Sequence, residues 1–290
     1  MPTIIMTDSN TEIPLWLKQK YDIPVVQMPY TLDGVEYTYD LGEKIDIQDF
    51  YKRVRGGSMP ITSTYSPQFY VDFWQPMLEA GNDILFICFS SGLSSVFSHV
   101  EMAREMVKQT YPERTVTLVD TKSISRGAAL LVYKALQMRE AGSSIEEITL
   151  WLENNKMRAQ HWFTVDDLFH LKRGGRLSGA AAAVGTLVNL KPVLTVNRQG
   201  QLVVAEKVIG RKKAMRTLLK RLEELAEDPE HNVLCILHAD CIDEARKLEQ
   251  MVREEMNFAE VWLDYVGPVI GTHAGPGTLA FTFMGKPRES

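Results

Sequence analysis

The sequence has few cysteines, and their placement limits the class of protein. Cys88, Cys235 and Cys241 are too few and too scattered for a disulfide framework, and no pair has the short spacing of a zinc site or a redox motif. Two of them stand in apolar, strand-like runs, which is typical of core residues. We therefore expect a reduced, cytoplasmic protein without a metal site.

Positive charge is also scarce, since 32 Lys and Arg residues face 37 Asp and Glu residues and leave a formal net charge of −5. Nucleic acid and anionic membrane surfaces both favour net basic partners. The chain start lacks the basic region of a signal peptide, and the longest apolar runs are too short to span a bilayer. We expect no nucleic-acid partner and no integral membrane segment.

Regular alternation of strand and helix patterns is present in the first half of the 290 residues. Alternation of this kind predicts parallel strands joined by crossover helices. The expected strands are 3–6, 23–28, 84–89 and 115–119, and the expected helices are 67–80, 93–109, 126–140 and 144–157.

The pattern changes after about residue 160. Two alternating runs, 191–196 and 201–208, flank Asn-Arg-Gln-Gly and predict an antiparallel hairpin, followed by helical patterns at 211–227 and 242–256. We therefore expect an α/β protein with two domains. We expect residues 1–160 to form a parallel α/β domain and residues 161–290 to form an α+β domain with a mainly antiparallel sheet.

Four turns are rich in hydroxyl side chains: TDSN at 7–10, ITSTYSP at 61–67, SSGLSS at 90–95 and DTKSIS at 120–125. Three of them follow predicted parallel strands, whose carboxyl ends share one edge of the sheet and commonly bind ligands. Helix amino termini and hydroxyl groups at such an edge suit an anionic head group. The alternative is that these residues are helix caps and turn formers.

Two further segments combine glycine with polar side chains. GTHAGPGTLAF at 271–281 places His273 on a tight loop, where it is either a site residue or a structural histidine. In LKRGGRLSGAAAAVGTLVNLKPVL at 171–194, the cations of the turn either clamp an anion or partner or are solvated. The small residues of the expected helix at Ala180–Val184 allow close approach of a ligand chain. The other five histidines are expected to be structural.

Familiar catalytic motifs are missing. The chain has no P-loop, no GxSxG sequence and no metal-ligand spacing, and nothing in it pairs a nucleophile with a base and an orienting carboxylate. We expect no catalytic residue, no metal and no cofactor.

Six of these motifs, TDSN, TSTYSP, SSGLSS, DTKSIS, LKRGGRLS…LVNLKPVL and GPVIGTHAGPGTLAF, stand in the order and approximate spacing of the DegV family, which the chain resembles over nearly its full length. The resemblance implies a bacterial fatty-acid-binding protein that encloses one long-chain fatty acid between two domains. It also implies the acyl-carrying subunit of a fatty acid kinase, whose carboxylate a separate kinase protein phosphorylates.

The resemblance also implies site residues. Thr62 and Ser94 match the positions that hold the carboxylate, and His273 matches the loop histidine beside it. Five further residues match less securely, as neighbours in the same motifs or as the basic turn at the head-group mouth or partner contact: Ser63, Gly92, Ser95, Arg173 and Arg176.

Two departures from the family pattern and two other functions stay open. The bulk of Tyr65 and Ser95 is expected to reshape the pocket mouth. A serine acyl hydrolase that uses His273 would need a carboxylate behind that histidine, and a binder of small phosphates or nucleotides would need a polar cavity.

A group of cations either docks an acidic surface of the kinase or is a solvated helix face; its members are Lys207, Arg211, Lys212, Lys213, Arg216, Lys220 and Arg221.

Overall fold

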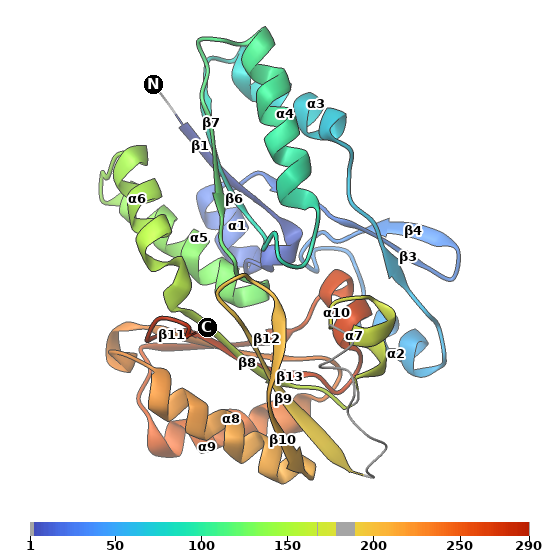
Figure 1. Cartoon of the computed structure of the whole chain (residues 1–290). Coiled ribbons are helices and arrows are strands. Elements are labelled where there is room, and N and C mark those ends of the chain that lie inside the picture. Colours follow the sequence, from blue (N-terminus) through green and yellow to red (C-terminus); the bar gives the residue numbers. More distant parts are fainter. Residues whose placement is uncertain (1–2, 167, 178–188, 290) are drawn as a thin grey trace.

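The computed structural model describes residues 3–166, 168–177 and 189–289. In these ranges it contains three β-sheets, which we name A, B and C, together with the helices that cover them (Figure 1). The expected alanine-rich helix at Ala180–Val184 lies outside the described residues, so the structure does not test it.

Sheet A is the parallel sheet expected in the first half, with strand order β2-β1-β6-β7. Every residue of β6 after Asp83 is buried, as expected for a strand that is covered on both faces. Because all strands of sheet A run in the same direction, their carboxyl ends lie at one edge of the sheet. The strands are β1 (Thr3–Asp8), β2 (Val25–Val26), β6 (Asp83–Cys88) and β7 (Val116–Asp120).

Helices surround sheet A. The buried residues of α4 recur at intervals of three and four, which gives this helix one apolar face, and α6 begins with a capping box between Ser144 and Glu147. The helices of this half are α1 (Leu15–Tyr21), α2 (Ile47–Arg55), α3 (Pro67–Glu79), α4 (Val96–Thr110), α5 (Ser125–Glu140) and α6 (Ile145–Asn155), with the 3-10 helices η1 (Ser9–Thr11) and η2 (Lys156–Arg158).

Sheet B is a small antiparallel excursion formed by β3 (Pro29–Leu32), β4 (Val35–Thr38) and β5 (Ile61–Thr62). Asp33 and Gly34, at the tip of the hairpin, have φ angles of 51° and 79°. Two positive φ angles are typical of a two-residue hairpin turn. The third strand, β5, pairs with β3 and carries Thr62 opposite Tyr30.

Sheet C has the order β10-β9-β8-β13-β11-β12, and its neighbouring strands are antiparallel except for β11 and β12. Its strands are β8 (Ala159–Thr164), β9 (Leu190–Val196), β10 (Leu202–Ile209), β11 (Val233–His238), β12 (Glu260–Tyr265) and β13 (Leu279–Met284). The accompanying helices are α7 (Phe169–Arg173), α8 (Arg211–Leu225), η3 (Pro229–His231), α9 (Ile242–Glu255) and α10 (Pro268–Ala274).

The two faces of sheet C belong to different cores. Figure 1 shows α8 and α9 on one side of the sheet and α5 on the other. Trp162 of β8 packs in the core beneath α8 and α9, whereas its neighbour Phe163 packs in the core shared with sheet A. Gly127 of α5 lies directly against the His161 ring, so α5 connects the two larger sheets.

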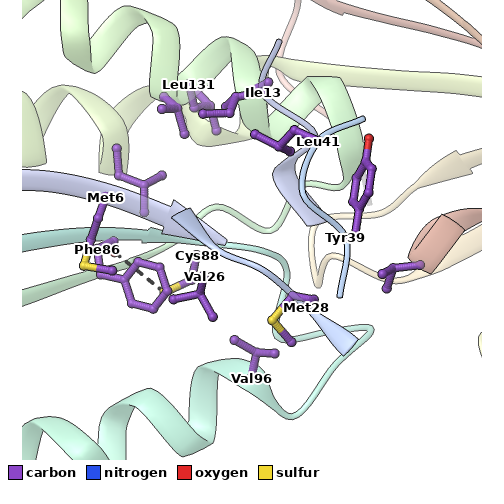
Figure 2. Close-up of a cluster of buried hydrophobic side chains, with 14 of the residues drawn as sticks. Met6, Ile13, Val26, Met28, Tyr39, Leu41, Phe86, Cys88, Val96 and Leu131 are labelled. Atoms are coloured by element: carbon purple, nitrogen blue, oxygen red, sulfur yellow. Dashed lines mark hydrogen bonds between the residues drawn. The ribbon is translucent and has the colours of Figure 1, made fainter. Parts of the chain in front are cut away.

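A close-packed core supports the carboxyl edge of sheet A (Figure 2). Phe86 and Cys88 of β6 meet Met6 of β1, and Met28 and Val96 continue the cluster toward the turns that follow these strands. Because protein cores are packed at nearly crystalline density, these turns start from rigid positions.

The expected fold class is confirmed, since sheet A is parallel and sheet C is mainly antiparallel. The expected hairpin of residues 191–196 and 201–208 is formed by β9 and β10. The helix expected from residue 93 begins at Val96, because the preceding residues form a turn. The division into domains at residue 160 stays a prediction.

Candidate functional site

A cavity of about 310 Å³ lies between sheet C and the turns at the carboxyl edge of sheet A. More than half of the residues that line it are apolar. The apolar lining consists of Met28, Phe89, Leu93, Ile124, Trp162, Phe163, Leu171, Leu202, Leu237, Val266, Val269, Ile270, Ala274, Ala280 and Phe281. The polar lining consists of Asn10, Thr62, Ser63, Thr64, Ser94, Ser95, Ser125, His161, Arg176, His273, Thr278 and Thr282.

One polar end of the cavity joins two distant parts of the chain. The hydroxyl oxygen of Thr62 on β5 lies 2.8 Å from Nε2 of His273 on α10, although 211 positions separate them. Ser94 belongs to the turn before α4, where its hydroxyl accepts a bond from the Val96 amide at 3.3 Å. Ser63 and Ser95 line the same cavity and are exposed. This end therefore opens toward solvent.

His273 is neutral at physiological pH. Burial, together with the nearby guanidinium groups of Arg176 and Arg173, lowers its pKa from 6.5 to about 3. Its Nδ1 atom is buried and has no hydrogen-bond partner among the described residues. A Cβ atom at Gly174 would lie under 3.0 Å from this nitrogen, so the absence of a side chain at Gly174 lets the ring occupy its position.

Arg173 connects the two segments that carry the Thr62–His273 pair. Its guanidinium donates to the carbonyl of Pro60 at 3.0 Å and to the carbonyl of Thr272 at 3.3 Å. Pro60 precedes Thr62 by two residues, and Thr272 directly precedes His273. A planar guanidinium holds two acceptors in fixed geometry, so Arg173 sets the distance between these segments.

Arg176 has a similar role beside Ser94, the expected contact residue before α4. Its Nε donates to the carbonyl of Leu93 at 3.2 Å, directly before Ser94, and its Nη1 donates to the carbonyl of Gly174 at 2.5 Å. Arg176 lines the cavity, and burial lowers its pKa. Both arginines thus hold backbone segments in place through hydrogen bonds to carbonyl groups, and the basic turn in the sequence did not predict this role.

The structure brings most of the expected site residues to this cavity, with two exceptions. Arg173 does not line it, although it holds residues that do. Gly92 does not line it either. A Cβ atom at Gly92 would lie 2.5 Å from the carbonyl oxygen of Gln199, so this glycine allows the turn to pack against the β9–β10 hairpin.

Sequence reasoning missed several lining residues on sheet C. His161 was expected to be only structural, yet it lines the cavity, and Thr278 and Thr282 do so as well. His161 and Thr282 are opposite one another in the register of β8 and β13. The alternation of side chains along a strand could have predicted a shared face, but only after the pairing of these strands was known.

A buried carboxyl group lies next to the cavity. The hydroxyl of Ser125 and the amide of Gly267 both donate to Glu12, the latter at 2.5 Å. Burial raises the pKa of Glu12 to about 7. Ser125 lines the cavity, so this hydroxyl separates the cavity from the carboxyl group of Glu12.

Two functional classes can be compared with this geometry. A serine hydrolase that used His273 would need a carboxylate on Nδ1, and in the described part of the chain this atom faces Gly174 instead. No group of three or more His, Cys, Asp or Glu side chains in the described ranges is placed to hold a metal ion. Among the described helices, none has both the length and the apolar content to cross a bilayer.

Comparison with known proteins gives consistent matches over the chain. The family model with the description "Uncharacterised protein, DegV family" matches residues 2–286. A DegV domain-containing protein of Clostridium perfringens is 39% identical over 286 residues, which cover 99% of this chain and 98% of that protein. A DegV domain-containing protein of Lactococcus lactis is 33% identical over 289 residues, with 98% and 99% coverage.

Solved structures show the same arrangement. A DegV family protein from Thermus thermophilus, described by its fatty acid binding, has a TM-score of 0.87 at 33% identity and covers 99% of this chain and 100% of that one. DegV from Bacillus subtilis, described as a fatty acid binding protein, has a TM-score of 0.84 at 29% identity, with the same coverage.

Proposed function

The chain belongs to the DegV family, and we propose that it binds a long-chain fatty acid in the cavity and presents the carboxylate to a separate fatty acid kinase. The observation that carries the proposal is a largely apolar cavity that ends at the Thr62–His273 pair. The binding of fatty acids by solved relatives supports it. A site for a small phosphate or nucleotide would have a more polar wall.

The apolar wall supplies most of the binding free energy. Burial of about fourteen methylene groups at ~0.8 kcal/mol each gives on the order of 11 kcal/mol, from which several kcal/mol of lost freedom must be subtracted. Phe89, Phe163 and Val269 are buried residues of this wall and come from the position directly after β6 in sheet A, from β8 in sheet C and from α10. Such a wall forms only after the two larger sheets have come together.

Neutral donors hold the carboxylate in this proposal. The hydroxyls of Thr62 and Ser94 donate to it, and each bond to a charged acceptor contributes roughly 1.5–3 kcal/mol. The Nε2–H group of neutral His273 donates to the Thr62 oxygen and so turns the Thr62 hydroxyl hydrogen toward the carboxylate. Arg173 and Arg176 add a positive field without leaving the backbone carbonyls that they bind. The exposure of Ser63 and Ser95 at this end leaves room for a kinase to reach the carboxylate.

The phosphoryl transfer itself is assigned to the partner. A carboxylate oxygen of the bound acid attacks the terminal phosphorus of a nucleoside triphosphate held by the kinase, an acyl-phosphate bond forms, and the nucleoside diphosphate leaves. The residues of this chain bind and orient the acid, and none of them changes covalently.

A basic groove between α8 and α9 is our candidate for kinase docking. Its lining consists of Arg211, Lys212, Met215, Arg216, Glu244, Lys247 and Met251. Arg211 is already paired with Glu244 at 2.8 Å, and elsewhere on α8 Arg221 is paired with Glu206 and Glu224. These pairs shorten the list of docking candidates from the sequence, and Lys212, Arg216 and Lys247 are the cations that we assign to an acidic partner surface.

Mass spectrometry of lipid extracted from the purified protein tests the binding proposal. We expect one fatty acid per chain, released on denaturation and retained at lower occupancy by a Thr62→Val, Ser94→Ala double variant washed under the same conditions. A protein that carries no fatty acid, and takes none up when the acid is added, would contradict the proposal. Hydrolysis of an acyl ester that disappears in His273→Ala would favour the hydrolase instead.

A further inference from the structure

A second polar region lines the cavity at the amino-terminal end of α5. Ile124 and Ser125, at which this helix begins, are lining residues, and so is Asn10 of η1, the segment that packs against α5. Thr62 and His273 belong to β5 and α10. The region is therefore built from elements other than those that carry this pair, and we name Asn10 and the start of α5 the inner polar site.

Hydrogen-bonding capacity is left over at the inner polar site. Asn10 is only 5% exposed, and its side-chain carbonyl oxygen has no hydrogen-bond partner among the described residues. The 16-residue helix α5 has no side-chain cap and no acidic residue in its first turn. The first amide groups of a helix have no acceptor within the helix. The Ile124 amide at this end already donates to Nε2 of His161 at 3.3 Å, so the amide of Ser125 is the donor that remains in the wall beside the Asn10 acceptor.

The neighbouring charge selects the kind of group that fits. Ser125 already donates its hydroxyl to the carboxyl group of Glu12, which is 1% exposed. A second carboxylate here would lie near this buried acid and be repelled by its ionised form. A neutral hydroxyl donates one hydrogen bond and accepts others, which matches a wall with one free acceptor at Asn10 and one free amide at Ser125.

We propose that the inner polar site binds a hydroxyl group carried on the acyl chain, so that hydroxylated long-chain fatty acids are preferred over unsubstituted ones. This inference rests on the proposed function of the cavity as a fatty acid site. The ligand hydroxyl donates to the Asn10 carbonyl oxygen and accepts from the Ser125 amide at the start of α5. An unsubstituted chain leaves these buried groups unpaired, which is unfavourable.

Competition binding on the wild-type protein tests the inference directly. The probes are octadecanoic acid and a series of hydroxyoctadecanoic acids with the hydroxyl at successive positions. We expect at least one isomer to bind about three- to tenfold more tightly than the unsubstituted acid, the range of one net hydrogen bond. If every isomer binds no better than octadecanoic acid, the inference is wrong. If none of the acids binds, the proposed function itself fails.

Two variants locate the effect. Asn10→Leu removes the free acceptor, so it should raise the affinity for octadecanoic acid and abolish the preference for the hydroxylated isomer. Ser123→Ala is the matched control, because Ser123 is buried and its hydroxyl oxygen has no partner among the described residues, but it does not line the cavity. A preference that survives Asn10→Leu would overturn the assignment, and if that variant does not fold, the wild-type series decides alone.

Discussion

Replacement of Gly174 by alanine is the sharpest test of how the head-group end is built. Gly174 has a φ angle of −75°, which alanine adopts without strain, so the substitution leaves the backbone unperturbed. The new Cβ atom, however, would lie under 3.0 Å from Nδ1 of His273. The ring must therefore move, and its other nitrogen moves relative to Thr62.

The expected magnitude follows from the existing distance. The Thr62 hydroxyl and Nε2 of His273 are 2.8 Å apart, and a displacement of about 0.7 Å takes such a pair beyond hydrogen-bond range. Without this partner the Thr62 hydroxyl is no longer oriented toward the carboxylate, and one bond to a carboxylate contributes roughly 1.5–3 kcal/mol, so we expect fatty acid affinity to fall about tenfold or more. The φ angle of Gly174 suits alanine, but displacement of a buried ring costs about 1–3 kcal/mol, so the free energy of unfolding of the variant must be measured beside its affinity.

Gly56→Ala is the matched control. Gly56 ends α2 with a φ angle of −73°, and its Cβ atom would meet only backbone at 3.2 Å, the distance at which the Cβ of Gly174 would meet the carbonyl of His170. Isothermal titration with one fatty acid and urea unfolding of both variants separate binding from stability. Equal affinities in the two variants would refute the reasoning, because the His273 position would then not depend on Gly174.

Three further predictions concern the ligand, the buried acid and the partner. Thr62→Val combined with Ser94→Ala should lower fatty acid affinity at least tenfold in titrations, and an unchanged affinity would contradict their assignment. Burial raises the pKa of Glu12 from 4.5 to about 7, so stability should fall by on the order of 3 kcal/mol as the pH rises through this range. Urea unfolding of Glu12→Gln should lack this fall, and an equal slope in both proteins would count against it. Reversal of Lys212 and Arg216 to Glu should slow acyl-phosphate formation with the kinase and reduce its salt dependence, while fatty acid binding persists; wild-type rates would place docking elsewhere.

The sequence predicts the layout of the fold because its patterns are local. Buried runs such as Asp83–Cys88 mark central parallel strands, and the Asn-Arg-Gln-Gly turn marks the β9–β10 hairpin. The order of the strands in sheet C cannot be predicted in this way, because β8 pairs with β9 and with β13, which are distant from it in the sequence. No local pattern encodes such a pairing, and so the cavity-lining role of His161 could not be predicted.

The sequence also predicts residue types better than their tasks. Thr62, Ser94 and His273 were expected at one site from the family resemblance, and the structure brings all three to the cavity. The sequence leaves open whether Arg173 clamps an anion or partner or is solvated, and in the structure its guanidinium binds two backbone carbonyls. Which groups a side chain such as Arg173 hydrogen-bonds depends on which loops meet in space, and the spacing of residues in the sequence does not specify this.

The position of the two arginines bears on how a bound carboxylate could react. A cation bonded directly to a carboxylate lowers its basicity, whereas a hydroxyl or a neutral imidazole orients it with less effect. Arg173 and Arg176 are close enough to depress the pKa of His273, but their donors are directed at backbone carbonyls. In the proposed complex their field therefore favours an ionised carboxylate and a neutral histidine, while neutral donors make the bonds. An oxygen held in this way keeps the nucleophilicity that attack on a phosphorus atom requires.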